Sequence, residues 1–231
     1  MPAKRLLIVT GPQGSGNHVF SRVFSMHPDV EGWRRLVNQY WVPSDEEPFA
    51  EYWVRPELLT AEQFESRDFF LANVSCPFFY DGVRQVPKIR QVADRARALG
   101  VEVAVAIVTR DQTINAVQQK RVGGEVTLIS ALEYYDEQLL NSDHEVHFID
   151  HEALFLWRER YVAYLGRILK FPVLTTSEVM KFITNDANHK YVRSVDQHWL
   201  DDTIRAGRRP FDQRWEDQQR GNTEFHLEHD G

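Results

Sequence analysis

The chain has 231 residues, 42% of them hydrophobic, and a formal net charge of −7. This length fits one α/β domain, and the acidic balance argues against a general attraction to nucleic acid or to an anionic membrane. The single cysteine, Cys76, excludes an internal disulfide and a cysteine-based metal cluster, and it indicates a reducing compartment.

The first predicted element is a buried strand formed by the apolar run Leu6–Val9. Gly11, Gly14 and Gly16 follow, and then a helix with an apolar face. Glycines let successive backbone N–H groups point into one concavity, which the positive end of the helix dipole also faces. The order strand, glycine-rich turn, helix therefore predicts a phosphate or sulfate site over residues 11–18. An ordinary structural turn is the alternative.

Gly11 and Gly16 match the spacing of the Walker pattern G-x-x-x-x-G-K-S/T, but the two positions after them differ. Asn17 stands at the lysine position and His18 at the hydroxyl position. That lysine normally reaches the β- and γ-phosphates, and the hydroxyl holds magnesium. An ordinary ATPase or GTPase is therefore disfavoured, and a cation for the anion must come from elsewhere in the chain.

The next stretch, residues 34–67, is rich in aromatic, proline and acidic residues. We predict an insertion of loops and short helices near the site. The insertion is either a surface excursion held by its aromatic side chains or part of a substrate site.

Strands and helices then alternate along the chain. Apolar runs predict strands at 69–74, 103–108 and 146–149, and Pro87 is expected at the first position of a helix. The other helices are expected at about 112–121, 126–141 and, as a pair, 151–169. Alternation predicts right-handed crossovers and a three-layer α/β/α fold with a parallel sheet, like that of P-loop nucleoside triphosphate hydrolases. We predict one such domain over 1–204 and a polar tail, loose or folded over ligand, over 205–231.

Ligands of such sheets bind beyond the carboxyl ends of the strands, which places residues 11–18, 75–81 and 110–111 on one rim. Arg110 is either an anion-binding residue or the partner of Asp111 or of a helix end. Lys120 and Arg121 are either a solvated face or a source of cations for the loop.

Few residues near the rim are candidates for acid–base chemistry. His18 is either a general base or a hydrogen-bond donor to phosphate. Asp81, Asp29 and Glu31 follow strand or helix ends near the rim, where a cap or turn role is the alternative. Cys76 is expected to be a small buried core residue and not a nucleophile. The histidines do not form a metal-ligand spacing, so no metal site is expected; they are His144, His147 and His151.

Three blocks within residues 6–173 carry a resemblance to a known family. The first is Gly14-Ser15-Gly16-Asn17-His18 with the later His27-Pro28-Asp29-Val30; the second is Thr109-Arg110-Asp111 between a strand and a helix; the third is 146–154 with 164–166 and 171–172. In order and spacing they resemble the 5′-phosphosulfate loop, the 3′-phosphate motif R-D-P, and the Y-E-D-L and F-L-G-L-P segments of the P-loop sulfotransferases.

The resemblance implies transfer of a sulfuryl group from 3′-phosphoadenosine 5′-phosphosulfate to an acceptor hydroxyl, without metal. Because such a transfer needs a base near the rim, we name His18 and Asp81 as the candidate catalytic residues. The implied donor-binding residues are Gly11, Gln13, Gly14, Ser15, Gly16, Asn17, His18, Arg110, Gln118 and Arg121.

The chain departs from the family pattern at four places. Gly14 replaces the basic residue of the loop, Gln118 the serine eight residues beyond the motif arginine, and Gln112 the proline after R-D. At the end of the second strand, Ser75-Cys76-Pro77 lacks the catalytic histidine of many members.

Two other functions stay open. One is an ATP- and Mg²⁺-dependent P-loop kinase that phosphorylates a nucleotide, sugar or nucleic-acid hydroxyl, with Lys120 or Arg121 replacing the missing lysine. The other is a non-catalytic binding module of the same fold. We expect a cytoplasmic protein without a membrane-spanning segment or signal peptide, whose partners are a nucleotide donor and a hydroxyl-bearing acceptor, with nucleic acid only as acceptor.

Overall fold

The computed structural model describes residues 4–39, 42–123, 125–184 and 188. The chain divides into two compact units, Met1–Asp186 and Ala187–Gly231, and only Asn188 of the second is described. The predicted tail 205–231 and its boundary at residue 204 lie outside the described residues. Everything below concerns the first unit.

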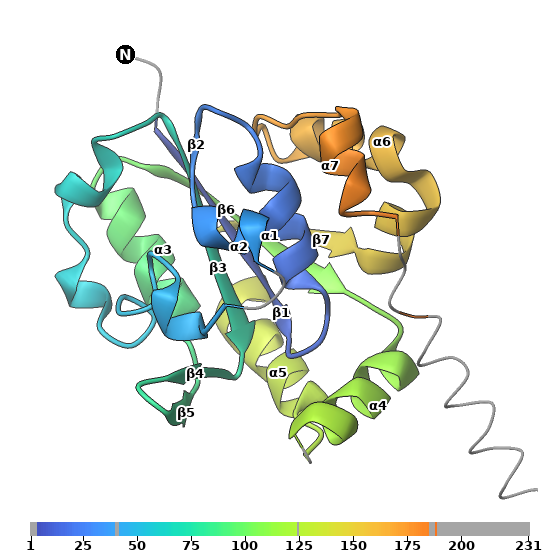
Figure 1. Ribbon diagram of the computed structural model, residues 1–231. Helices are drawn as coiled ribbons and strands as arrows, with labels where there is room; N and C mark the ends of the chain where they lie inside the picture. The colour runs from blue at the N-terminus through green and yellow to red at the C-terminus, as the bar shows by residue number, and fades with distance from the viewer. Residues whose placement is uncertain (1–3, 40–41, 124, 185–187, 189–231) are drawn as a thin grey trace, which may run out of the picture. The chain divides into compact units, whose positions relative to one another are not determined.

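The first unit is built on a five-stranded sheet in which all the strand pairs are parallel (Figure 1). Ile8 at the centre lies between Ala72 and Val105 of the neighbouring strands. The predicted parallel α/β fold is therefore confirmed. In spatial order the strands are β2 (Val30–Glu31), β3 (Phe69–Cys76), β1 (Arg5–Pro12), β6 (Glu102–Thr109) and β7 (Glu145–Asp150).

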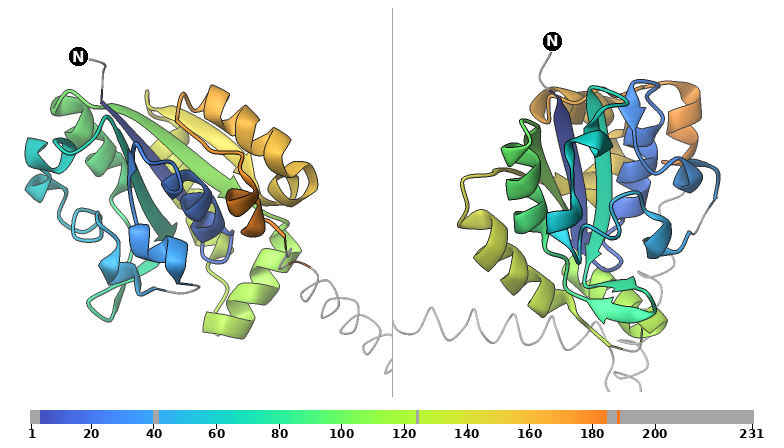
Figure 2. Two further views of the ribbon diagram at one scale, coloured as in Figure 1. Left: turned by 45° about the horizontal axis from the view of Figure 1, so that its top comes forward. Right: turned by 90° about the vertical axis from the view of Figure 1, so that its left-hand side faces the viewer.

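Helices cover both faces of the sheet (Figure 2). Successive β1 residues point to opposite faces, so Leu6 and Ile8 join one core cluster, while Leu7 and Val9 join the other. The first cluster contains α3 (Ile89–Ala98), α5 (Leu128–Tyr135) and the insertion, and the second contains α1 (Asn17–Ser25), α6 (His151–Ile168) and α7 (Ser177–Lys181). The expected three layers are therefore present.

The insertion predicted over residues 34–67 consists of loops and short helices, as expected, and buried aromatic side chains hold it to the core. Phe49, Trp53 and Phe64 are at most 5% exposed and pack in the same cluster as β1 and β3. The short helices are α2 (Arg34–Asn38), η1 (Ser44–Glu46), η2 (Pro56–Leu58) and η3 (Ala61–Phe64).

The connection after β3 was not predicted in detail. A small antiparallel hairpin forms there from β4 (Phe78–Tyr80) and β5 (Val83–Gln85). The expectation that Pro87 opens a helix is wrong, because α3 begins at Ile89. The N–H of Lys88 donates to the Trp53 carbonyl at 2.9 Å, and the Tyr134 hydroxyl bonds the Pro87 carbonyl, so tertiary contacts hold this segment outside the helix.

The later helices agree with the sequence. α4 spans Gln112–Gly123, α5 continues as a π-helical turn over Asp136–Leu140, and the expected pair at 151–169 is a single α6 broken at Arg158, whose φ is 43°. Among the described residues, no helix combines the length and the apolar character needed to cross a membrane.

Candidate functional site

The loop between β1 and α1, residues 11–18, is called the glycine loop below. Gly14 and Gly16 have φ values of 81° and 97°, in the left-handed region that glycine adopts without strain. Gly16 is the N-cap of α1 and offers no side-chain cap. The N–H of Val19 donates to the Gly16 carbonyl at 2.9 Å. The helix dipole favours an anion at the N–H groups before it, those of Asn17 and His18.

Gly16 also makes a close approach that a side chain would prevent. A Cβ atom on Gly16 would lie 2.3 Å from Cδ2 of His151, the first residue of α6. His151 is 2% exposed and packs against the ring of Phe155 at 4.9 Å between centroids. The buried ring of His151 therefore packs against the glycine loop at Gly16.

Arg110 and the helix that follows it hold the other side of the glycine loop. Nη1 of Arg110 donates to the Gly14 carbonyl at 2.5 Å and to Oε1 of Gln118, and the side chain is 8% exposed. Nε2 of Gln119 donates to the Gln13 carbonyl at 2.7 Å. The predicted place of Arg110, on the rim and within reach of the glycine loop, is confirmed.

Asn17 occupies the Walker lysine position but connects α1 to the sheet. Its Nδ2 donates to Oδ1 of Asn73 at 2.9 Å and to Oγ of Ser75 at 3.1 Å. Ser15 is fully buried, and its hydroxyl fills the space beside Gly11, where a Cβ would lie 2.2 Å from Oγ. The side chains of Asn17 and Ser15 therefore build the glycine loop, and contact to an anion from these residues would come from the backbone.

His18 lies between the glycine loop and the insertion. Its ring meets that of Trp33 edge-on, with 5.5 Å between centroids. Burial and, to a smaller extent, the nearby Arg22 guanidinium lower the pKa of His18 to about 4. The imidazole is therefore neutral near pH 7. It can accept one hydrogen bond and donate another, but it brings no positive charge.

The remaining predicted site residues are spread along the rim. Asp81 is an exposed turn residue of the β4–β5 hairpin, with a φ of 51°, and its N–H donates to Asp45 Oδ1 at 3.2 Å. Lys120 and Arg121 are exposed on α4. Cys76 is buried, and burial raises the pKa of its thiol to about 12, in agreement with the core role expected for it.

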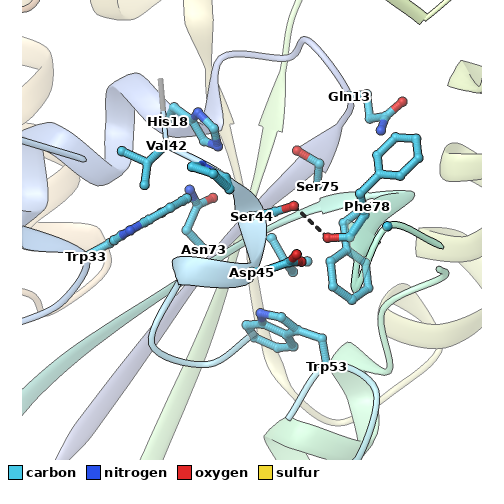
Figure 3. Close-up of a pocket in the computed structure, with 14 residues that line it drawn as sticks. Gln13, His18, Trp33, Val42, Ser44, Asp45, Trp53, Asn73, Ser75 and Phe78 are labelled. Atoms are coloured by element: carbon cyan, nitrogen blue, oxygen red, sulfur yellow. Dashed lines mark hydrogen bonds between the residues drawn. The ribbon is translucent and has the colours of Figure 1, made fainter. Parts of the chain in front are cut away.

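A pocket of about 320 Å³ opens beside the glycine loop (Figure 3). Gln13 and His18 from the loop, Asn73 and Ser75 from β3, and the indole ring of Trp33 form part of its wall. Its other lining residues come from the insertion, β3 and the hairpin: Val42, Pro43, Ser44, Asp45, Trp53, Val74, Phe78, Phe79 and Gly82.

Glu47 ties the insertion to β3 immediately behind this pocket. Its carboxyl accepts hydrogen bonds from the N–H groups of Phe49 (2.8 Å), Trp53 Nε1 (3.1 Å) and Asn73 (3.0 Å). Burial raises the pKa of Glu47 to about 8, although the three N–H groups act in the opposite direction.

Sequence reasoning missed Asn73, Trp33 and Glu47. Asn73 did give a signal, because a lone amide interrupts the apolar strand run Phe69–Val74. Trp33, just before the insertion, and Glu47, within it, gave none, since aromatic and acidic residues are common in this part of the chain.

The histidines near β7 have separate acidic neighbours. His144 Nε2 lies 3.0 Å from Asp94, and His147 Nε2 lies 2.9 Å from Glu145. In the described part of the chain, no group of three or more His, Cys, Asp or Glu residues could hold a metal ion.

Comparison with known proteins gives matches among solved structures alone. No protein-family model and no curated protein matches the chain. Among solved structures, the chain is similar to the sulfotransferase domain of the Synechococcus PCC 7002 olefin synthase, with 12% identity, a TM-score of 0.48, and coverage of 80% of this chain and 78% of that one. A sugar kinase from Janibacter sp. HTCC2649 has 15% identity, a TM-score of 0.38, and coverage of 75% and 99%. Mouse sulfotransferase SULT7A1, solved with PAP, has 14% identity, a TM-score of 0.40, and coverage of 78% and 62%.

Proposed function

We propose that the chain transfers a sulfuryl group from a phosphosulfate nucleotide to an acceptor hydroxyl. One observation carries the proposal: the glycine loop has Arg110 on one side and the 320 Å³ pocket on the other. A donor bound to the uncapped start of α1 would therefore present its terminal group to a molecule held in the pocket. The three sequence blocks that resemble P-loop sulfotransferases agree with this arrangement.

The residues fit an anionic donor in part. The first-turn N–H groups of α1 and the Arg110 guanidinium are suited to phosphate oxygens, and Lys120 and Arg121 add positive charge on α4. The donor supplies an activated sulfur with a nucleotide phosphate as leaving group. The hydroxyl oxygen forms the new S–O bond, the bond to the leaving phosphate breaks, and the hydroxyl proton must pass to a base.

His18 is the proposed acceptor of that proton. The imidazole is neutral near pH 7 and lines the pocket, and His18 is the last residue of the glycine loop. Its low pKa makes it a weak base while the loop is without an anion. Negative charge brought by the donor stabilises the imidazolium and raises the pKa of His18, so proton transfer is favoured only when donor and acceptor are both bound.

Isothermal titration with adenosine 3′,5′-bisphosphate tests the proposal directly. We expect micromolar or tighter binding that does not need Mg²⁺. Tighter binding of ATP with Mg²⁺, followed by ATP turnover, would instead establish the kinase alternative. The amide of Asn17, held by β3, makes that outcome less expected, because it cannot replace the lysine that reaches the β- and γ-phosphates. Absence of binding by either nucleotide at millimolar concentration would favour a non-catalytic module.

A further inference from the structure

Two buried N–H donors in the wall of the 320 Å³ pocket have no hydrogen-bond acceptor among the residues that the structure describes. They are Nδ2 of Asn73, which is 4% exposed, and Nε1 of Trp33, which is 3% exposed. A buried donor without an acceptor is destabilising, and native proteins contain few of them. Two in one pocket wall indicate that the pocket is built around a ligand with acceptor atoms.

The surrounding contacts fix the direction of the Asn73 donor. The backbone N–H of Asn73 donates to Glu47, and its Oδ1 accepts from Asn17. Of the two polar atoms of the Asn73 side chain, Nδ2 is the one without a hydrogen-bond partner among the described residues. Asn17 therefore acts as a positioning residue, since its own amide sets the orientation of the Asn73 amide.

A second tryptophan in the same pocket gives a direct contrast. Trp53 also lines the pocket, but its Nε1 donates to Glu47 at 3.1 Å. The chain thus satisfies the indole N–H of Trp53 internally, whereas that of Trp33 has no acceptor among the described residues. Figure 3 shows both rings in the pocket wall.

The charges of the pocket wall restrict the ligand further. Of the described residues that line the pocket, none is Lys or Arg, and the two ionisable ones are His18 and Asp45. An anionic ligand would find no counter-charge there and would lose its hydration on entry. The walls are largely aromatic, from Trp33, Trp53 and Phe78, so they suit the flat face of a ring.

We propose that this pocket binds a small neutral ring compound whose hydroxyl or carbonyl oxygen accepts hydrogen bonds from Asn73 Nδ2 and Trp33 Nε1. Its identification as the acceptor in group transfer rests on the function proposed above, but the binding itself does not. The polar end of the compound would then lie beside His18 and the glycine loop, where a hydroxyl would meet the donor.

The test compares three compounds of one shape in the absence of any nucleotide. 4-Methylphenol, toluene and 4-methylbenzoate are titrated into the full chain, and binding is followed by ¹H–¹⁵N spectra of the indole N–H groups. We expect the phenol to bind about tenfold or more tightly than toluene, because it supplies the missing acceptor, and the benzoate to bind more weakly than the phenol. The Trp33 indole signal, assigned by its loss in Trp33→Phe, should move on adding the phenol.

Three variants assign the preference to the two donors. Trp33→Phe keeps an aromatic ring without the N–H, and Asn73→Asp keeps the oxygen that Asn17 binds but removes the donor; each should reduce the preference for phenol over toluene to about threefold or less. Trp157→Phe, at a tryptophan that is 55% exposed on α6 and does not line the pocket, is the matched control and should leave the preference unchanged. If Asn73→Asp fails to fold, Trp33→Phe and its control still decide the question.

The proposal is overturned if the wild-type chain binds none of the compounds at their solubility limits, if toluene binds as tightly as the phenol, or if the preference in Trp33→Phe stays as large as in Trp157→Phe. Arg110→Ala should leave all three affinities unchanged. A chain that binds no nucleotide would therefore contradict the proposed function but not the binding of the phenol. Loss of the preference for phenol over toluene would contradict the pocket proposal but not nucleotide binding.

Discussion

Arg110 holds the glycine loop and is proposed to bind the donor, and both roles can be measured in one variant. Its guanidinium bonds the Gly14 carbonyl and Gln118 and stands where a donor phosphate is proposed to bind. Charge-assisted hydrogen bonds contribute about 1.5–3 kcal/mol each. Arg110→Ala should therefore weaken adenosine 3′,5′-bisphosphate binding roughly ten- to a hundredfold, as measured by calorimetry. Arg110→Lys should recover part of the loss, because lysine lacks the planar fork.

The structure changes the stability expected of the same variant. From sequence alone, an anion-binding Arg110 would leave the melting temperature of the ligand-free chain almost unchanged. Because Arg110 is 8% exposed and holds a loop carbonyl, we now expect Arg110→Ala to lower that temperature as well. Arg90→Ala, at an exposed position on α3, is the control that should change neither quantity. Unchanged nucleotide affinity in folded Arg110→Ala would assign Arg110 a purely structural role.

Glu47 makes stability depend on pH. The pKa of its carboxyl is about 8 in the folded chain against a reference value of 4.5, so the folded state retains a proton that the unfolded chain releases. The contribution of the Glu47 carboxyl to the free energy of unfolding is complete below about pH 4.5 and declines as the pH rises toward 8. Above about pH 8 this group causes no further change in stability. Thermal melts from about pH 5 to about pH 9 should show this decline.

Glu47→Gln should flatten the pH dependence, because the amide does not titrate. The variant should also be less stable at low pH, since one side of an amide cannot accept from the N–H groups that face the carboxyl. Glu57→Gln, at an exposed position of the insertion, should retain the wild-type profile. A decline that persists in Glu47→Gln would assign it to another group.

At the scale of elements, the turn between β1 and α1 depends on Gly16. Gly16→Ala meets two obstacles: a left-handed φ of 97° and a Cβ placed 2.3 Å from the His151 ring. Gly100 has a φ of 83°, but a Cβ there would meet nothing within 4 Å, so Gly100→Ala isolates the conformational cost, about 1–2 kcal/mol. Urea melts should show Gly16→Ala to be clearly more destabilising than Gly100→Ala.

The double variant Gly16→Ala with His151→Ala identifies the source of the difference. If the clash with the imidazole is responsible, the two substitutions should be less than additive, because removal of the ring makes room for the methyl group. Full additivity would show that Gly16 is required for its φ alone.

Elements with a strong local signal were predictable. The runs Leu6–Val9 and Val103–Val108 are apolar without interruption, as central parallel strands require, and both are fully or almost fully buried strands.

The β4–β5 hairpin was missed although its Asp81-Gly82 turn is a recognised hairpin signal; both residues have positive φ. Its strands are only three residues each, too short for a pattern to be recognised. Pro87 was placed wrongly because its position is set by contacts with Trp53 and Tyr134, which are distant in sequence.

At the scale of the whole molecule, the sequence predicted the rim but not the pocket. In a parallel sheet the carboxyl ends of all the strands lie at the same edge, so Arg110 and the glycine loop could be placed together from sequence. The pocket instead combines Trp33, Trp53 and Asn73, which approach one another only because the insertion packs on β3 through Glu47. No local pattern encodes that packing, because the contact depends on one buried carboxyl among many acidic residues.

The two ends of the sheet should also be separable in experiment. Arg5, at the amino end of β1, is 4% exposed and forms ion pairs with Glu102 at 3.0 Å and Glu145 at 2.8 Å, while its Nε donates to the Leu169 carbonyl at 2.9 Å. These contacts join β1, β6, β7 and the end of α6 far from the carboxyl-end rim. Because Glu102 is 57% exposed, part of the ion-pair energy is screened by solvent. Arg5→Ala should then cost about 2–4 kcal/mol of unfolding free energy, mostly through the unpaired carbonyl and the partly buried Glu145.

Well below its melting temperature, the Arg5→Ala variant should bind adenosine 3′,5′-bisphosphate and 4-methylphenol like the wild-type chain. Arg110→Ala should do the opposite for the nucleotide, with a large loss of affinity. A weaker nucleotide affinity in Arg5→Ala, at a temperature where circular dichroism shows it folded, would mean that strand packing at the amino end controls the glycine loop, and the division of the sheet into a stabilising end and a ligand-binding end would be wrong.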